Sequence, residues 1–213
     1  MRIALISDTH GHLPSTELFE GADLILHAGD IGPHYNVQEW QVTTFAPWLH
    51  QLRQKMDIPF WGTLGNHDFG KNWGLDLDFP IIVDDVVLAR GMKIWFSPWS
   101  PRFGNWAWMR EEPELTEFYS QIPVDVDIVV SHSPMFGALD ANIDGTLCGS
   151  KALRVRLREI ARTRDISQRP LLVCGHIHEA KGYLDAEFAD VYNVSCLDES
   201  YQMRPDPITW IEL

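Results

Sequence analysis

Short apolar runs, each ending in a polar cluster, recur along the whole chain. Five of them have the length of a strand: residues 2–6, 24–27, 59–62, 126–130 and 171–174. Each run is followed by Gly, Asp, Asn, His or Ser residues, which favours a strand that leads into a loop. Because apolar and polar residues do not alternate within the runs, the pattern is typical of strands buried on both faces, although periodicity alone does not separate these from buried helix.

Two longer segments have helical spacing. Residues 36–55 carry large apolar side chains at the spacing of one helix face, and Pro47 is expected to kink that helix or split it in two. Residues 151–164 form an amphipathic pattern with Leu153, Leu157 and Ile160 on one face and arginines on the other. Residues 81–96 and 183–213 are β-rich and suggest meanders. The sum is a mixed α/β (α+β) fold in which helices cover two sheets packed face to face.

Length and composition fit one soluble globular domain over residues 1–213. The chain is 45% hydrophobic and 22% charged, which is ordinary for such a domain. Its three cysteines (Cys148, Cys174 and Cys196) are odd in number and widely spaced, which suits a reducing compartment better than a disulfide framework. Neither a signal peptide nor a long uncharged apolar run is found, so we expect a cytoplasmic protein without a membrane segment.

The polar clusters that follow the five strands share one set of side-chain types. They are Asp8-Thr9-His10, Gly29-Asp30, Gly65-Asn66-His67-Asp68, Ser131-His132-Ser133 and Gly175-His176-Ile177-His178. Residues at the carboxyl ends of neighbouring strands converge on one edge of an α/β sheet, where ligands bind. Asp8 and His10 lie two apart, so in an extended chain their side chains point the same way and can hold one ion.

The chemistry of these clusters favours a pair of divalent cations. Mixed oxygen and nitrogen ligands suit Mn²⁺, with Fe, Zn²⁺, Ni²⁺ or Mg²⁺ as alternatives, more than Ca²⁺. Two such ions roughly 3.5–4 Å apart activate a bridging water and clamp phosphoryl oxygens for in-line attack. Taken alone, each cluster has an ordinary interpretation as a turn or a hydrogen-bonded loop. Their joint occurrence, each after a strand, favours hydrolysis of a phosphate ester.

The net charge of −13 limits the classes of substrate that the protein can bind. A surface this acidic repels the backbone of a long nucleic acid, which we therefore exclude as a partner. At the site itself, two divalent cations carry more positive charge than two carboxylates and one hydroxide remove. A small phosphate ester fits a positive pocket inside an acidic shell.

The same motifs, in the same order, resemble the signature of the calcineurin-like metallophosphoesterases. The resemblance implies a four-layer αββα sandwich with two mixed sheets flanked by helices. It implies one ion held by Asp8, His10 and His178, a second by Asn66, His132 and His176, and Asp30 bridging both. It also implies attack by a hydroxide that bridges the ions. His67 would contact the phosphate and act as general acid, with Asp68 orienting it; imidazole can protonate an alkoxide leaving group near neutral pH.

An aromatic stretch at residues 95–108 bears on the substrate. One interpretation is a hydrophobic plug under a long loop. The other is a wall beside the metals, with Trp99 stacking on a base and Arg102 and Asn105 adding polar contacts; stacking is worth roughly 1–3 kcal/mol per base. This stretch, with the sequences around His132 and His176, is similar to the small metallophosphoesterase-domain-containing (MPPED) branch. That similarity implies a phosphodiesterase acting on small diesters such as cyclic nucleotides.

Other histidines and other functions stay open as alternatives. We expect His12 at the pocket mouth or outside the site, His27 as a hydrogen-bonded core residue beside the Asp30 loop, and His34 and His50 on the surface. The same metals would also serve a phosphomonoesterase, acting on nucleotides or proteins. A non-catalytic scaffold is expected to have lost ligands, and none is missing here. Exposed aromatic residues would support a homodimer.

Overall fold

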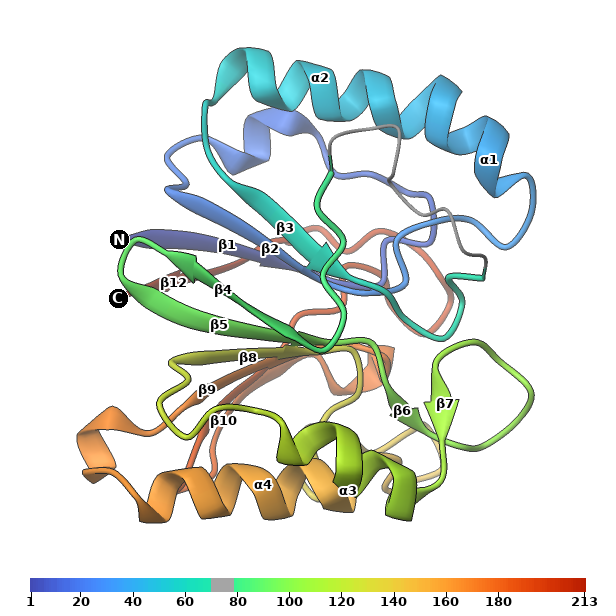
Figure 1. Ribbon diagram of the computed structural model, residues 1–213. Helices are drawn as coiled ribbons and strands as arrows, with labels where there is room; N and C mark the ends of the chain where they lie inside the picture. Colours follow the sequence, from blue (N-terminus) through green and yellow to red (C-terminus); the bar gives the residue numbers. More distant parts are fainter. Residues whose placement is uncertain (70–78) are drawn as a thin grey trace.

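The computed structural model describes residues 1–69 and 79–213, and these residues form four layers (Figure 1). A four-stranded and a six-stranded sheet face each other in the middle. Helices α1 (Val37–Trp40) and α2 (Ala46–Lys55) cover the outer face of the first sheet. Helices α3 (Glu112–Ser120) and α4 (Lys151–Arg162) cover the outer face of the second. The predicted αββα sandwich is confirmed.

The first sheet has the strand order β12-β1-β2-β3. Its members are β1 (Arg2–Ile6), β2 (Leu24–Ala28), β3 (Phe60–Thr63) and β12 (Thr209–Glu212). β1, β2 and β3 are parallel, whereas β12 is antiparallel to β1. A 3-10 turn at Thr16–Phe19 leads from β1 to β2. The three parallel strands therefore end at the same edge.

The second sheet has the order β10-β11-β9-β8-β5-β4. Its members are β4 (Asp85–Ala89), β5 (Met92–Ser97), β8 (Ile128–Ser131), β9 (Leu171–Cys174), β10 (Gly182–Asp185) and β11 (Asp190–Asn193). The four central strands are parallel and the two edge strands antiparallel. A small parallel pair, β6 (Ser100–Pro101) and β7 (Met109–Arg110), closes the aromatic loop, and 3-10 turns lie at Ile166–Gln168 and His178–Ala180.

Three apolar cores explain why the central strands are mostly apolar. In β1, Ile3 and Leu5 enter the core between the two sheets, while Ala4 and Ile6 enter the core under α2. A third core lies between the second sheet and helices α3 and α4. Side chains alternate between the faces of a strand, so burial of both faces favours apolar residues at most positions.

The segment predicted as one helix over residues 36–55 does not split at Pro47. Between α1 and α2 the chain widens into a π-helical turn, Gln41–Phe45, and the backbone N–H of Ala46 bonds to the carbonyl of Gln41. Proline lacks an N–H and clashes with the carbonyl four residues before it. A wider turn just ahead of Pro47 accommodates both effects without ending the helix.

Three further comparisons with the sequence concern the second half of the chain. Helix α4 begins as predicted, and Ser150 caps it by accepting a hydrogen bond from the backbone N–H of Leu153. Helix α3 is not predicted; a capping box of Glu111 and Glu114 starts it. The meander expected over residues 183–213 divides, because β12 pairs with β1 in the first sheet and not with a strand of the second.

Among the described residues, no helix combines the length and apolarity that a membrane crossing requires.

Candidate metal centre

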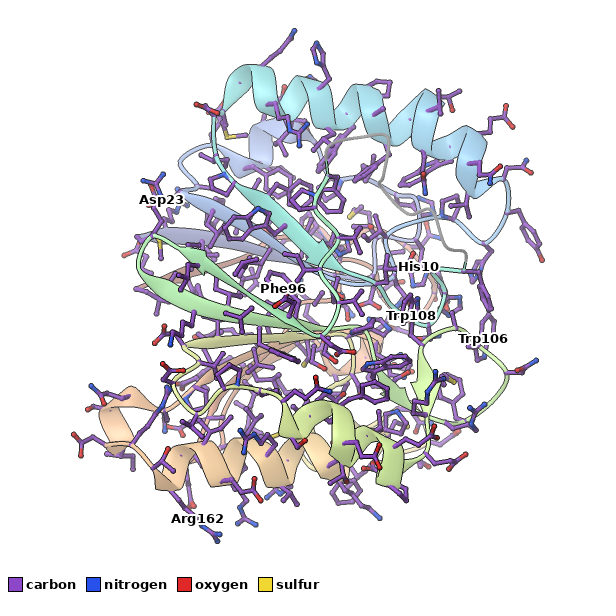
Figure 2. The ribbon with its side chains drawn as sticks, in the orientation of Figure 1. His10, Asp23, Phe96, Trp106, Trp108 and Arg162 are labelled. Carbon is purple, nitrogen blue, oxygen red and sulfur yellow. The ribbon has the colours of Figure 1, made fainter. Side chains whose placement is uncertain are left out.

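The predicted polar clusters meet at one edge of the molecule, where β1, β2, β3, β8 and β9 end. Figure 2 shows His10 at this edge, on the same side as Trp106, whereas Asp23 lies at the opposite edge. Six of the seven predicted ligands are buried; His176 is partly exposed. The fold therefore brings together side chains as far apart in sequence as Asp8 and His178, which are separated by 170 residues.

Asp8, His10 and His178 form the first group of potential ligands. One donor atom from each lies within 4.8 Å of the others. The Asp8 carboxylate lies 3.6 Å from Nε2 of His178 and accepts hydrogen bonds from Ser195 Oγ at 2.8 Å and from the backbone N–H of His176 at 3.0 Å. The prediction of an extended backbone at these two residues is wrong, because Asp8 and His10 have left-handed φ values of 53° and 43°. β1 ends before them, and a turn rather than a strand brings the two side chains together.

Asp30 lies between this group and a second one. Its Oδ2 is 3.6 Å from His10 Nε2 and 3.5 Å from His132 Nε2. On the far side, Asn66 Oδ1 lies 2.8 Å from the same His132 nitrogen. Asp30 thus has the position that a residue shared by two cations requires.

His176 completes the cluster less closely. Its ring centroid is 4.9 Å from that of His132, and its side chain lines the cavity described below. The groups of mutually close donor atoms found in the described part of the chain do not contain it. Like Asp8, His10 and Asp30, it has a left-handed backbone, with φ 69°.

His67 faces the centre, but Asp68 does not orient it. His67 Nε2 is 4.0 Å from Asp30 Oδ2, and its backbone N–H donates to Asp30 Oδ1 at 2.8 Å. The Asp68 carboxylate is fully buried and accepts hydrogen bonds from the backbone N–H groups of Ile31, Gly32 and Gly65. The predicted role of Asp68 is therefore corrected, because its oxygens are occupied in tying the loop after β2 to the loop after β3.

The partner of the His67 ring is His34, which the sequence places on the surface. The two Nδ1 atoms are 3.0 Å apart. His34 follows Asp30 by four residues in the same loop, and no sequence signal distinguishes it from an ordinary exposed histidine. His27, by contrast, is the buried core residue expected: its Nε2 bonds to Thr9 Oγ1 and its Nδ1 accepts from the Gly29 N–H.

The aromatic stretch contributes to the site through residues other than those predicted. Trp99 is only 6% exposed, donates to Asp84 and stacks on Phe118 at 4.5 Å, so it belongs to the core beneath α3. Arg102 pairs with Glu111, and neither Arg102 nor Asn105 lines the cavity. These three assignments are corrected. Trp99 thus fits the interpretation of the stretch as a hydrophobic plug, whereas Phe103 and Trp106 line the cavity, and base stacking there stays a prediction.

A cavity of about 730 Å³ opens beside the centre. Phe103 and Trp106 from the aromatic loop and Tyr201 from the loop before β12 form its aromatic walls. The Trp106 ring lies 4.4 Å from that of His67. The other described residues that line the cavity are Asp30, His34, Asn66, His67, Asn142, Thr146, Cys148, His176, Ile177, His178, Glu179 and Glu199. The opening therefore joins a cluster of potential ligands to an aromatic surface.

The electrostatics of the centre favour cation binding. Burial lowers the pKa of His10 to about 2 and that of His176 to about 3, so both rings are neutral and have a lone pair free at neutral pH. Burial, followed by the nearby charges of Asp68 and Asp8, raises the pKa of Asp30 well above its usual range. Burial by itself would raise the pKa of Asp8, but its contact with His178 holds that pKa below the usual range. A divalent cation would offset the repulsion between the carboxylates and accept the lone pairs of the neutral imidazoles.

The hydrogen-bond partners of the imidazoles fit divalent cations. Nδ1 of His132 lies 2.9 Å from the carbonyl of Ala28, and Nδ1 of His178 lies 3.0 Å from that of Asp198. A carbonyl only accepts, so each Nδ1 carries the hydrogen and each Nε2 turns a lone pair toward the centre. A lone pair on His132 Nε2 therefore faces a lone pair on Asn66 Oδ1, and a cation bound by both atoms would remove the repulsion between them. Nδ1 of His10 is buried with no hydrogen-bond partner among the described residues.

Two glycines make room for the carboxylates. A Cβ at Gly65 would overlap the Asp30 carboxylate, and one at Gly175 would overlap that of Asp8. Glycine is required at both positions because the backbone passes directly against a potential ligand.

Comparisons with known proteins agree with this geometry. The family profile "Calcineurin-like phosphoesterase" matches residues 1–180. Human Metallophosphoesterase domain-containing protein 1 is 29% identical, over 97% of this chain and 69% of that protein. A UPF0046 protein of Caenorhabditis elegans is 25% identical, over 98% and 79%.

Among solved structures, a dimetal phosphatase from Danio rerio is similar in fold, with a TM-score of 0.51 at 10% identity, over 92% of this chain and 87% of that one. The profile covers most of the chain and all seven predicted ligands. The chain belongs to the calcineurin-like phosphoesterase family.

Proposed function

We propose that this protein is a dimetal phosphodiesterase that hydrolyses small diesters of the cyclic-nucleotide type. The observation that carries the proposal is the convergence of Asp8, His10, Asn66, His132 and His178 around Asp30 at one sheet edge, beside an aromatic cavity. These residues follow the ends of β1, β3, β8 and β9, and Asp30 follows the end of β2, so polar side chains from five strand ends meet at one place.

The residues divide into two sets of ligands. Asp8, His10 and His178 would hold one ion; Asn66, His132 and His176 would hold the other, and Asp30 would bind both. When bound, two such ions supply Lewis acidity, which activates water and offsets charge on the phosphoryl oxygens. Mn²⁺ is our first choice because the set mixes carboxylate and amide oxygens with imidazole nitrogens.

His67 supplies the proton for the leaving group in this proposal. Its Nε2 points toward Asp30, and its backbone N–H holds the Asp30 carboxylate in place. A positioned imidazole contributes typically about 10²–10⁴-fold when the leaving group is an alkoxide. The ring lies beside Trp106 and both residues line the cavity, so an ester bound there would contact both.

The lining of the cavity supports a substrate with one phosphate and an aromatic substituent. Phe103, Trp106 and Tyr201 offer surfaces on which a base can stack. Glu179 and Glu199 line the same cavity, and no lysine or arginine is among its described lining residues. A second or third phosphate would meet like charge there, which disfavours nucleoside polyphosphates and long nucleic acids.

Hydrolysis of bis-p-nitrophenyl phosphate and of 2′,3′-cyclic nucleotides by Mn²⁺-loaded protein tests the proposal. We expect Asp30→Ala to abolish both activities and to lower bound Mn²⁺, measured by elemental analysis, from two ions per chain. Asp57→Ala removes an exposed carboxylate before β3, at the opposite edge, and serves as the matched control. Full activity in Asp30→Ala would refute the site. A strong preference for p-nitrophenyl phosphate would instead make the protein a phosphomonoesterase.

A further inference from the structure

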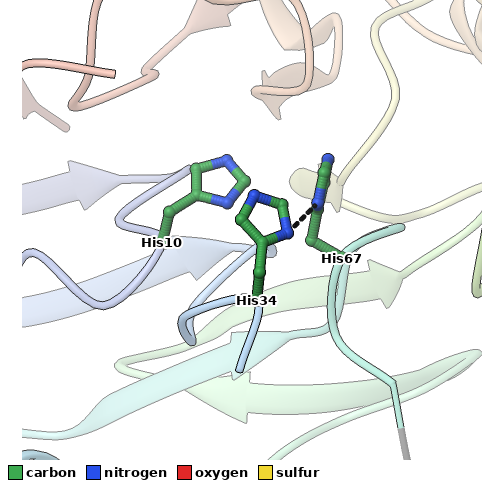
Figure 3. A group of neighbouring side chains, drawn as sticks. All are labelled: His10, His34 and His67. Atoms are coloured by element: carbon green, nitrogen blue, oxygen red, sulfur yellow. Dashed lines mark hydrogen bonds between the residues drawn. The ribbon is translucent and has the colours of Figure 1, made fainter. Parts of the chain in front are cut away.

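His34 and His67 form a pair of imidazoles at the mouth of the metal centre (Figure 3). The dashed line in that figure joins their Nδ1 atoms, which are 3.0 Å apart, and the ring of His10 lies beside that of His34. The rings of His34 and His67 meet edge to face, with centroids 4.4 Å apart. His34 comes from the loop after β2 and His67 from the loop after β3, so the contact is tertiary and not local.

A contact at this distance constrains which nitrogens carry hydrogen. One Nδ1 must donate and the other must accept, because two lone pairs or two N–H groups would repel each other. A proton donor at Nε2 of His67 has hydrogens on both ring nitrogens, so its Nδ1–H donates to Nδ1 of His34. After Nε2 gives its proton to the leaving-group oxygen, the Nδ1–H remains bonded to His34, and the emptied Nε2 is the atom that must be reloaded.

The other contacts of His67 leave this function to His34. Trp106 and His10 flank the ring, with centroids at 4.4 and 4.8 Å, and the hydrogen bond that His67 Nδ1 makes within the described part of the chain is to His34. Asp68, the neighbouring carboxylate, is occupied by backbone N–H groups. An acceptor on His34 fixes the rotation of the ring, so that Nε2 faces Asp30.

We propose that His34 is a positioning residue for the general acid: it accepts a hydrogen bond from Nδ1 of His67 and holds Nε2 toward the leaving-group oxygen. This rests on the proposed function, in which His67 is the proton donor. The pair has the arrangement of a catalytic histidine and the acceptor behind it, with an imidazole in place of a carboxylate.

The experiment compares leaving groups in the Mn²⁺-loaded enzyme. The nitrophenolate released from bis-p-nitrophenyl phosphate needs little protonation, whereas the alkoxide released from a 2′,3′-cyclic nucleotide needs a proton. We expect His34→Ala to lower kcat on the cyclic nucleotide roughly 10- to 100-fold, and kcat on the nitrophenyl ester less than about threefold, because only the first reaction uses the acid. His34→Gln, whose amide oxygen accepts a hydrogen bond, should restore part of the loss.

Two measurements that do not depend on turnover accompany the rates. Nitrogen-15 spectra of histidine-labelled, metal-free protein should show the His67 Nδ1 signal shift in His34→Ala. Elemental analysis should show the same Mn²⁺ content as the parent. Loss of one equivalent of metal would overturn the proposal in favour of a cation held by His10, His34 and His67, whose donor atoms lie within 4.8 Å of one another.

Other outcomes are equally decisive. An equal loss on both esters, or a change in KM alone, would overturn the positioning role. His50→Ala, which removes an exposed histidine bonded to Gln54, is the matched control and should change neither rate. If His67→Ala itself shows no dependence on the leaving group, the proposed function fails. If His67→Ala shows it and His34→Ala does not, only the present inference fails.

Discussion

Replacement of Asp68 by alanine should destabilise the protein severely, although the sequence suggests a catalytic role for this residue. The carboxylate accepts hydrogen bonds from Ile31 at 3.0 Å, Gly32 at 3.2 Å and Gly65 at 2.9 Å, and it is entirely buried. Without it, three backbone N–H groups lose their acceptor in a place that water does not reach. Burial raises the pKa of Asp68 to about 7, which the backbone N–H groups oppose by favouring the carboxylate.

The magnitude follows from those three donors. A buried donor without a partner costs about 1–3 kcal/mol. Three of them give roughly 3–9 kcal/mol, a large part of the total stability of about 5–15 kcal/mol that a domain has. Asp68→Asn should lower the stability less than Asp68→Ala does, because the asparagine side chain keeps one oxygen acceptor. Its NH₂ group still faces a backbone N–H, so part of the loss remains.

Guanidinium unfolding of the metal-free protein, followed by tryptophan fluorescence, measures this directly. The Asp68→Ala midpoint should fall well below that of the parent, with Asp57→Ala unchanged as the control for loss of a carboxylate. Because the same bonds brace the loops that carry Asp30 and Asn66, Mn²⁺ affinity should fall together with stability. An unchanged midpoint with lost activity would show that Asp68 acts on the chemistry, and our structural account of it would be wrong.

Three further predictions use the same logic. Burial lowers the pKa of His27 from 6.5 to about 3, so the unfolded chain takes up a proton there that the folded chain does not. The free energy of unfolding must therefore fall as pH drops below 6.5, and His27 accounts for a loss of about 2 kcal/mol at pH 5. Urea titrations near neutral pH and at pH 5 should show a smaller loss in His27→Gln than in the parent. Trp106→Ala should raise the KM for a cyclic nucleotide roughly 10- to 100-fold. Trp99→Ala should instead lower the free energy of unfolding by about 3–5 kcal/mol and leave the KM of the folded protein unchanged. Mass spectrometry after brief maleimide treatment should find Cys148 modified first, because it lines the cavity while the other two thiols are buried; equal labelling of all three would contradict the buried core.

The sequence predicted the parts of the fold that depend on local pattern. The strands at Arg2–Ile6 and Leu171–Cys174 match the apolar runs residue for residue, because burial on both faces leaves no polar interruption. The position of β12 beside β1 could not be predicted, since pairing between the two ends of the chain leaves no local signature. The π-helical turn before Pro47 was missed for a related reason: composition marks the strain and not how the backbone relieves it.

The candidate site divides along the same line. Motif spacing found the seven potential ligands, because each must follow a strand end. It did not find His34, whose importance comes from a tertiary contact with His67. It chose Trp99 over Trp106, because spacing within an aromatic loop does not say which ring turns into the core. It also assigned Asp68 by adjacency to His67, whereas hydrogen-bond partners are decided by which loop lies opposite.

The left-handed backbone at Asp8, His10, Asp30 and His176 has a consequence for engineering. Each such residue costs the folded chain about 1–2 kcal/mol that glycine would not cost. Asp30→Gly should therefore relieve this backbone cost, while it removes the acceptor of the His67 N–H and the carboxylate between the two sets of ligands. At these four positions, selection for a sturdier empty scaffold and selection for a working hydrolase oppose each other.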